Sequence, residues 1–473
     1  MRGSAALIRK VLYCVVILGL IVAMVPYSRW LNQEKNRRDL GEATIGQVDA
    51  GSFMLKLALL GGARGIAANV LWTRALDLQK VQEWDKLKAT VDLITKLQPH
   101  FLKIWTFQGW NLAYNVSVEW DAPEDKYEWI KQGINFLKTG VENNTKSPDL
   151  IWDTAWTYYH KVGFADEAVL LRRLFRDDPD RDFKTYPDAR NDDVPTFRND
   201  NFQLGFGWFT RSVAMVDKGA ERQTTGIEVS APDVEYVDAP EQRKGRPGDL
   251  AFRSMPAHAQ TRYATSLEKM SILNVRPTFG EVASVEWSRA LDEWVRFGQY
   301  PFPAFNDDKT MIYLDQSTDL ALMARLDKEE HNRWYWTDRW ANQMNYPYWK
   351  DRCDAERTPQ GVEARRLFHE GAVAMENAQF NDAVKHYKAG LEIWDAVLKD
   401  HPLYSRDDLN LQDTGKILVK YARALEQIQK EVPKDTPFYD LLDGALKNPS
   451  RDPFDAMQII PSAVRKRIVS ASE

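Results

Sequence analysis

One predicted helix carries the carboxylates best suited to catalysis in this sequence. The stretch GEVASVEWSRALDEWVRF, residues 280–297, has the spacing of an amphipathic helix and includes Trp287 and Trp294. Its acidic side chains are Glu281, Glu286, Asp292 and Glu293. Two carboxylates beside tryptophans could cleave a polysaccharide. Nothing in the sequence pairs two of them, so ordinary charges on a helix surface are the favoured interpretation.

Other chemical signatures are absent from the sequence. It contains no nucleophile elbow, no H-E-x-x-H zinc motif, no phosphate-binding loop and no dinucleotide-binding glycine pattern. His369 and His386 fall within helical patterns, where we expect them to be solvated or packed. The two cysteines, Cys14 and Cys353, suggest neither a disulfide nor a metal site. We therefore predict no catalytic residue, no metal and no cofactor.

Composition and charge narrow the classes of partner. The net charge is −5, and 28% of the residues are charged. Binding to nucleic acid needs a basic stripe, so we do not expect nucleic acid as a partner. The chain has 17 tryptophans. Most of them recur at helical spacing, which favours packing between helices over a carbohydrate or peptide groove.

The N-terminus contains one candidate membrane segment. No charge occurs from Val11 to Ser28, and Arg9 and Lys10 precede this run. Eighteen helical residues span about 27 Å, close to the thickness of a bilayer core. The residues before Pro26 make a poor cleavage site, so an uncleaved signal anchor is favoured over a cleaved signal peptide. We assign residues 1–30 to a cytoplasmic N-terminus and a single-pass transmembrane anchor.

The orientation of the anchor follows from its position in the chain. Basic residues flank both of its ends, so the distribution of charge does not distinguish the two orientations. A short N-terminus before a single anchor usually stays inside, and we expect the C-terminal bulk to be extracytoplasmic. A second apolar stretch, Phe53 to Trp72, contains Lys56 and Arg64, which argues against a second span. We interpret residues 31–68 as a juxtamembrane linker and a first helix.

Paired helical patterns then recur along the chain. In LFHEGAVAMENAQFNDAVKHYKAGLEIW, small residues at Gly371, Ala383 and Gly390 would let two helices approach closely, with Tyr387 filling the space between them. Residues 69–179 contain three further patterns of this kind, each closed by a proline or followed by one. Trp105 and Trp152 take equivalent places in two of them. An insertion is expected from Asn115 to Asp125, between the two helices of one pair.

These patterns resemble the tetratricopeptide repeat family. The resemblance covers Asn69 to Pro179 and Ala364 to Pro402, which is under half of the chain. It implies an all-α fold in which helix pairs stack into an α-solenoid. A generic helical bundle is the alternative.

The resemblance also implies a binding groove lined by the first helix of each pair. The register assigns to this groove the residues Asn69, Trp72, Gln79, Lys80, Lys103, Trp110, Tyr114, Asp153, His160 and Lys161. Long donors and aromatic platforms suit an extended peptide with some acidic groups. The same residues could instead be solvated, or could pack against another part of the chain.

The remaining regions are assigned by composition. Residues 180–255, rich in Pro, Gly and Asp, are expected to form an irregular insertion with short strands in GIEVS and VEYVDA, and strands are expected only there. Residues 256–362 are expected to be helical, with Pro256 in a first turn. This region includes an aromatic cluster near Trp334 to Trp349. Residues 363–473 are expected to hold the last repeat and a helical tail.

We thus expect a membrane-anchored scaffold or assembly factor that binds a protein or peptide partner in a helical-repeat groove. Two alternatives remain: a polysaccharide-acting helical toroid with a tryptophan-lined cleft, and a structural protein of the cell envelope.

Overall fold

A computed structural model describes residues 64–222, 247–268, 277–304, 307–316 and 328–442. The predicted anchor at residues 1–30, the linker up to residue 63, the strands expected at 226–230 and 234–239 and the basic tail all lie outside the described residues. Within the described part, no helix combines the length and the apolar character that crossing a membrane requires.

The described chain is predominantly helical, as predicted. Its N-terminal half contains α3 (Arg64–Lys80), α4 (Trp84–Leu97), α5 (Leu102–Trp110), α6 (Pro123–Asn143), α7 (Pro148–Trp156), α8 (Val162–Phe164) and α9 (Ala168–Asp177). Its C-terminal half contains α10 (Asn201–Asp217), α11 (Pro247–Glu268), α12 (Glu281–Gly298), α13 (Lys328–Gln343), α14 (Tyr346–Glu356), α15 (Pro359–Glu376), α16 (Phe380–Lys399), α17 (Pro402–Ser405) and α18 (Asp408–Gln427).

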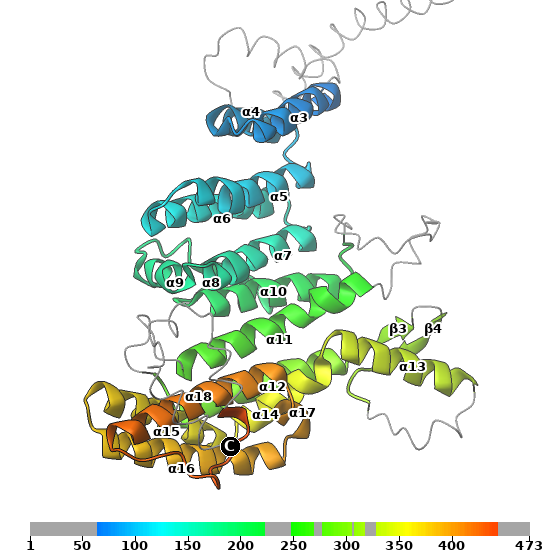
Figure 1. The fold of residues 1–473 in the computed structure, drawn as a ribbon. Coiled ribbons are helices and arrows are strands. Elements are labelled where there is room, and N and C mark those ends of the chain that lie inside the picture. Colours follow the sequence, from blue (N-terminus) through cyan, green and yellow to red (C-terminus); the bar gives the residue numbers. More distant parts are fainter. Residues whose placement is uncertain (1–63, 223–246, 269–276, 305–306, 317–327, 443–473) are drawn as a thin grey trace, which may run out of the picture.

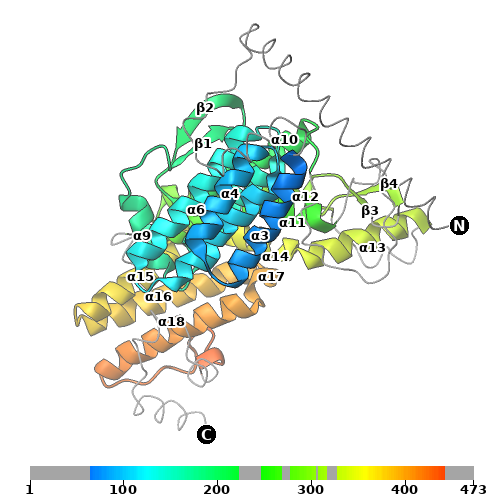
Figure 2. The same ribbon diagram turned by 90° about the horizontal axis from the view of Figure 1, so that it is seen from above.

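The helices lie in successive layers, from α3 and α4 at one end to α15, α16 and α18 at the other (Figure 1). Seen from above, the α3–α4 pair covers the layers beneath it, and α13 extends to a different side from α15, α16 and α18 (Figure 2). Three buried apolar clusters follow one another along the stack, built from residues 68–263, 250–353 and 348–442. The arrangement fits a helical-repeat protein.

Side-chain caps explain where several helices begin. The Ser147 side chain accepts a hydrogen bond from the Leu150 N–H at the start of α7, and Asp200 accepts from the N–H groups of Phe202 and Gln203 at the start of α10. Such caps satisfy N–H groups that have no partner within the helix.

Small residues set the closest approaches between paired helices. A Cβ atom built on Gly140 of α6 would lie 2.8 Å from Trp105 Cγ of α5, and one on Gly390 of α16 would lie 2.7 Å from Phe368 Cε1 of α15. At Gly371 the added atom would meet the Tyr387 ring. The glycines singled out in the sequence therefore lie at helix–helix contacts.

The helix expected to end before an insertion at Asn115 instead continues. A π-helical segment, Asn111–Val116, and a 3₁₀ turn, Ser117–Glu119, extend α5. A second π-helical segment, Thr157–Lys161, extends α7. Only three residues, 120–122, separate the extended helix from α6. The polar residues of this stretch suggested a loop, but the helix continues into it, first as the wider π-helix and then as the tighter 3₁₀ turn.

Trp105 and Trp152 do not have equivalent surroundings. The expectation that they take equivalent places in two repeats is therefore wrong. Trp105 is buried against α6 of its own pair, at Gly140. Trp152 contacts Phe209 of α10 and Phe252 of α11. α10 packs along α7. The stack therefore changes its pairing at this point.

The region 180–255 is more regular than expected. It contains the 17-residue helix α10 and an antiparallel hairpin of β1 (Thr185–Asp188) and β2 (Asn191–Phe197). The glycines that weaken the helical pattern, Gly205 and Gly207, allow close contact with Tyr159 and Tyr186. Tertiary packing thus outweighs their low helix propensity.

Two further expectations are corrected in the following region. A second hairpin, β3 (Phe302–Ala304) with β4 (Asp307–Ile312), lies outside 180–250, next to α13. Pro256 lies in the interior of α11 and not in its first turn, because the helix already begins at Pro247. The aromatic cluster of this region is carried by α13 and α14 themselves.

Candidate functional site

Five of the ten residues predicted for the groove are joined by ring contacts, a hydrogen bond or an electrostatic interaction on α5, α7 and their extensions. These are Trp110, Tyr114, Asp153, His160 and Lys161. A sixth, Gln79, adjoins them because its amide donates a hydrogen bond of 3.2 Å to Asn111 Oδ1. The structure therefore brings together residues from three successive first helices.

The central feature is a line of stacked rings, which we name the aromatic row. It consists of Trp110, Tyr114, His160, Trp156 and Trp152. The ring centroids of neighbouring members lie 5.6, 6.0, 4.7 and 5.4 Å apart, and the rings are close to parallel. The row crosses from α5 to α7 and so joins two layers of the stack.

Polar contacts fix the middle of the aromatic row. The Tyr114 hydroxyl and Nδ1 of His160 share a hydrogen bond of 3.2 Å, whose donor depends on the imidazole tautomer. Burial raises the pKa of Tyr114 and lowers the pKa of His160. Both groups are therefore held in their neutral forms. The Lys161 ammonium lies over the Tyr114 ring, 5.2 Å from its centroid.

Asp153 is the acidic member of this cluster. Its Oδ2 accepts a hydrogen bond of 2.8 Å from Thr106 Oγ1, across the α5–α7 interface. Burial raises the pKa of Asp153 to about 7, although the Thr106 hydrogen bond acts in the opposite direction. A carboxyl that is neutral at mildly acidic pH can donate a proton or a hydrogen bond.

The two ends of the aromatic row differ in exposure. The Trp110 side chain is 47% exposed. Trp152, at the other end, is mostly covered by Phe209 and Phe252. A large ring that is half accessible and rigidly stacked is typical of surfaces that bind protein. Trp110 is therefore the member of the aromatic row best placed to meet a partner, and Lys161 beside it in the cluster is partly exposed.

Four predicted groove residues do not join this cluster. Trp72 packs edge-on against Phe101 and Phe107. Lys80 is exposed and forms an ion pair with Asp77. Asn69 and Lys103 are exposed at other points of α3 and α5. Trp72 thus contributes to packing, and the other three face solvent.

The predicted groove did not include Trp152, Trp156, Thr106 or Asn111. Trp156 stacks on both Trp152 and His160. A signal was available, because Trp152, Trp156 and His160 follow one another at intervals of four residues. The π-helical segments were not visible in the sequence, and they shift the faces that follow them.

The carboxylates considered for polysaccharide cleavage do not face a tryptophan-lined cleft. Trp287 and Trp294 of α12 are 1% and 0% exposed and fill the core. Glu281 and Asp292 are exposed, and Glu286 accepts a hydrogen bond of 2.7 Å from Gln260. Glu293 faces a cavity, where it pairs with Arg296. A polysaccharide-cleaving site would need Trp287 and Trp294 to line an open cleft, but both are packed in the core.

Three further side chains considered in the sequence, Cys353, His369 and His386, are buried or contact a neighbour. Burial raises the pKa of the Cys353 thiol to about 12, which disfavours its nucleophilic form. His386 lies 3.3 Å from Glu370 Oε2, and His369 contacts the Phe279 ring.

Comparison with known proteins adds no identification: no protein-family model matches the chain, and no curated protein matches it significantly.

Proposed function

We propose that this chain is a membrane-anchored scaffold that binds an extended segment of a partner protein across the aromatic row. The tetratricopeptide-like character of its repeats, the N-terminal anchor and the extracytoplasmic position of its bulk are parts of the same proposal. The observation that carries it is the aromatic row itself, because the row forms one rigid surface across two helix pairs.

The chemistry of the partner segment follows from the accessible members of the row. Trp110 offers a flat apolar face for a proline, an aliphatic or an aromatic side chain. Lys161 is a cation over the neighbouring Tyr114 ring, and within the described part of the chain it forms no ion pair. A segment that carries both an apolar side chain and an acidic group would match these two features. Stacked repeats read such ligands through many modest contacts.

The test uses the tagged full-length chain recovered from native membranes in mild detergent. Quantitative mass spectrometry compares the wild type with a variant carrying Trp110→Ala and Lys161→Gln. The matched control is Trp120→Ala: Trp120 is 43% exposed and stacks on Trp129, outside the aromatic row. We expect one partner to be lost from the double variant and kept by the control.

Two measurements make this result decisive. A synthetic segment of the recovered partner should bind the wild type, and the double variant should bind it at least tenfold more weakly. The melting temperatures of both variants should stay close to that of the wild type. If recovery falls only in proportion to stability, the row packs against the protein itself and the proposal fails.

The anchor is tested separately. We expect the full chain to resist extraction from membranes by carbonate and salt, and residues 32–473 alone to be soluble. Full-length protein in the soluble fraction would contradict the anchor, and a mature N-terminus near Pro26 would favour a cleaved signal.

A further inference from the structure

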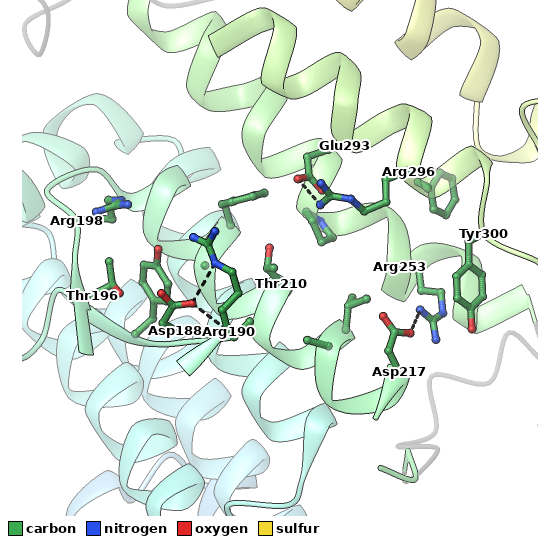
Figure 3. A pocket seen from close by; sticks show the side chains of 18 residues that line it. Asp188, Arg190, Thr196, Arg198, Thr210, Asp217, Arg253, Glu293, Arg296 and Tyr300 are labelled. Atoms are coloured by element: carbon green, nitrogen blue, oxygen red, sulfur yellow. Dashed lines mark hydrogen bonds and ion pairs between the residues drawn. The ribbon is translucent and has the colours of Figure 1, made fainter. Parts of the chain in front are cut away.

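A cavity of about 550 Å³ lies between the β1–β2 hairpin, α10, α11 and α12 (Figure 3), and no member of the aromatic row lines it. Its size falls within the range of sites that hold small organic molecules. The apolar part of its wall consists of Tyr186, Phe206, Val213, Ala214, Pro256 and Phe297. The rest of the wall is polar and contains four arginines.

Specific contacts hold the walls of this cavity in place. The Tyr186 ring lies directly over Gly207, where an added Cβ atom would collide with the ring. Trp208 Nε1 donates a hydrogen bond of 3.2 Å to the Thr185 carbonyl. These contacts fix the hairpin on α10. On the opposite wall, Pro256 lies inside α11 and provides no N–H to the helix.

Two of the four arginines are already neutralised by the protein. Arg253 lies 2.7 Å from Asp217 Oδ1, and its guanidinium stacks 3.7 Å from the Tyr300 ring centroid. Arg296 lies 2.6 Å from Glu293 Oε1. These pairs leave little net charge on the α10, α11 and α12 walls.

The hairpin contributes the other two arginines, and they are not neutralised in this way. The Arg190 side chain is 94% exposed, and its Nε lies 3.7 Å from Asp188 Oδ1, which is a loose contact. Arg198 donates a hydrogen bond of 2.9 Å to the carbonyl of the adjacent Phe197. Among the side chains described at this wall, the two guanidinium groups lie beside one carboxylate, that of Asp188. Guanidinium groups suit carboxylate and phosphate oxygens.

A further polar residue lines the same cavity. This residue is Thr210, whose buried Oγ1 has no hydrogen-bond partner among the described residues. Figure 3 shows Thr210 between Arg190 on one side and Arg253 on the other. An unsatisfied buried hydroxyl costs free energy, so a group that binds here would gain by hydrogen bonding to it.

We propose that this cavity binds a small organic oxyanion with an apolar body. Arg190, Arg198 and Thr210 bind the carboxylate or phosphate group, and the rings of Tyr186, Phe206 and Phe297 hold the apolar part. A purely inorganic anion would leave the rings unused, and a neutral apolar molecule would leave the arginines unused. The proposal is independent of partner binding at the aromatic row.

The experiment measures binding of naphthalene probes to the full chain in detergent by fluorescence anisotropy. The anionic probes are 1-naphthoate and 1-naphthyl phosphate. The comparison probes are neutral 1-naphthol, cationic 1-naphthylmethylammonium and inorganic phosphate, the last tested by competition. We expect both anionic probes to bind at least tenfold more tightly than any comparison probe. The tighter of the two identifies the headgroup as a carboxylate or a phosphate.

Variants then locate the binding. Arg190→Gln with Arg198→Gln should reduce the affinity for the anionic probes at least tenfold and leave the weak affinity for 1-naphthol unchanged. The matched control is Arg173→Gln, because Arg173 is exposed, has a loose contact of 3.6 Å to Asp177 and lies outside the cavity. Thr210→Val should weaken anion binding several-fold without lowering the melting temperature, since its hydroxyl has no partner to lose.

Equal affinity for 1-naphthol and the anionic probes would overturn the proposal, as would competition by inorganic phosphate as strong as that by 1-naphthyl phosphate. Anion binding that survives the double arginine substitution would place the site elsewhere and overturn it as well. If the double arginine variant unfolds, Thr210→Val is the deciding variant. An affinity for the anionic probes that is unchanged in Thr210→Val then contradicts the proposal.

Discussion

The Tyr114 hydroxyl lies 3.2 Å from Nδ1 of His160, and this contact joins residues 46 positions apart in the chain. It links the π-helical extension of α5 to that of α7. Thr106 and Asp153, 47 positions apart, make a second hydrogen bond across the same interface. Two layers of the stack are therefore fixed in register by side chains, at the place where the aromatic row crosses between them.

We expect the Tyr114–His160 contact to stabilise the fold measurably. Tyr114→Phe removes the hydroxyl and keeps the stacked ring, so the free energy of unfolding should fall by about 1 kcal/mol. In a double-mutant cycle with His160→Phe, the coupling energy should be roughly 0.5–1.5 kcal/mol. Chemical denaturation measures both. A cycle between Tyr335→Phe, at an exposed tyrosine of α13, and His160→Phe should be additive. Additivity in the Tyr114 cycle would show that the hydrogen bond contributes nothing.

Asp153 should make stability depend on pH. Its pKa is about 7 in the folded chain, because burial disfavours the carboxylate, against about 3.9 when unfolded. Between these values the folded state binds more protons, so the free energy of unfolding falls as the pH rises from about 4 to about 7. Asp153→Asn removes this titration. The variant should match the wild type near pH 4 and be more stable by roughly 1–3 kcal/mol at pH 8.

Denaturant titrations at a series of pH values test this expectation. Asp77→Asn on exposed α3, where the carboxylate pairs with Lys80, serves as the control for removing one carboxylate. A stability difference between Asp153→Asn and the wild type that is the same at pH 4 and pH 8 would contradict the raised pKa.

Glycine substitutions should separate helix contacts from open helix surface. Gly140→Ala and Gly390→Ala place a methyl group within 3 Å of Trp105 and Phe368, so each should cost about 1–3 kcal/mol of stability. At Gly65 the nearest atom is Gln98 Nε2, 3.5 Å away. Gly65→Ala should therefore be neutral or stabilising by up to about 1 kcal/mol. Equal melting temperatures for all three variants would refute the assigned contacts.

A buried ion pair holds α14 against α15 and α17. Arg365 donates to both carboxylate oxygens of Glu356, at 2.6 and 3.0 Å, and the Tyr404 hydroxyl donates to Oε1 at 2.7 Å. Burial acts to raise the pKa of Glu356, but Arg365, together with Arg352 and Tyr404, holds it below its usual range. The pair is therefore ionised inside the fold.

Breaking this pair should be costly. Glu356→Gln removes the hydrogen-bonded countercharge of Arg365, and we expect a loss of about 3–5 kcal/mol. Glu363→Gln, on α15, removes an exposed partner of Arg366 and should cost less than about 1 kcal/mol. Thermal unfolding of the two variants is the measurement. Similar losses of stability in the two variants would show that the buried Glu356–Arg365 pair contributes no more than the exposed pair.

The sequence by itself determined the local parts of this protein. The spacing of Gly371, Tyr387 and Gly390 predicted a tightly packed helix pair, and α15 and α16 form it at those residues. The intervals of four residues that place Trp110 below Tyr114 are likewise visible in the chain. Such features depend on neighbours within one or two helical turns, and the backbone geometry of a helix fixes them.

Tertiary structure decided the rest. Helix α10 forms in a region whose glycines argued against a helix, because those glycines meet tyrosine rings from other elements. The π-helical segments turn His160 toward Tyr114, and the cavity takes its walls from a hairpin and three helices. These arrangements depend on which faces of distant segments meet. That choice is made by the burial of the whole set of side chains, and no local pattern encodes it.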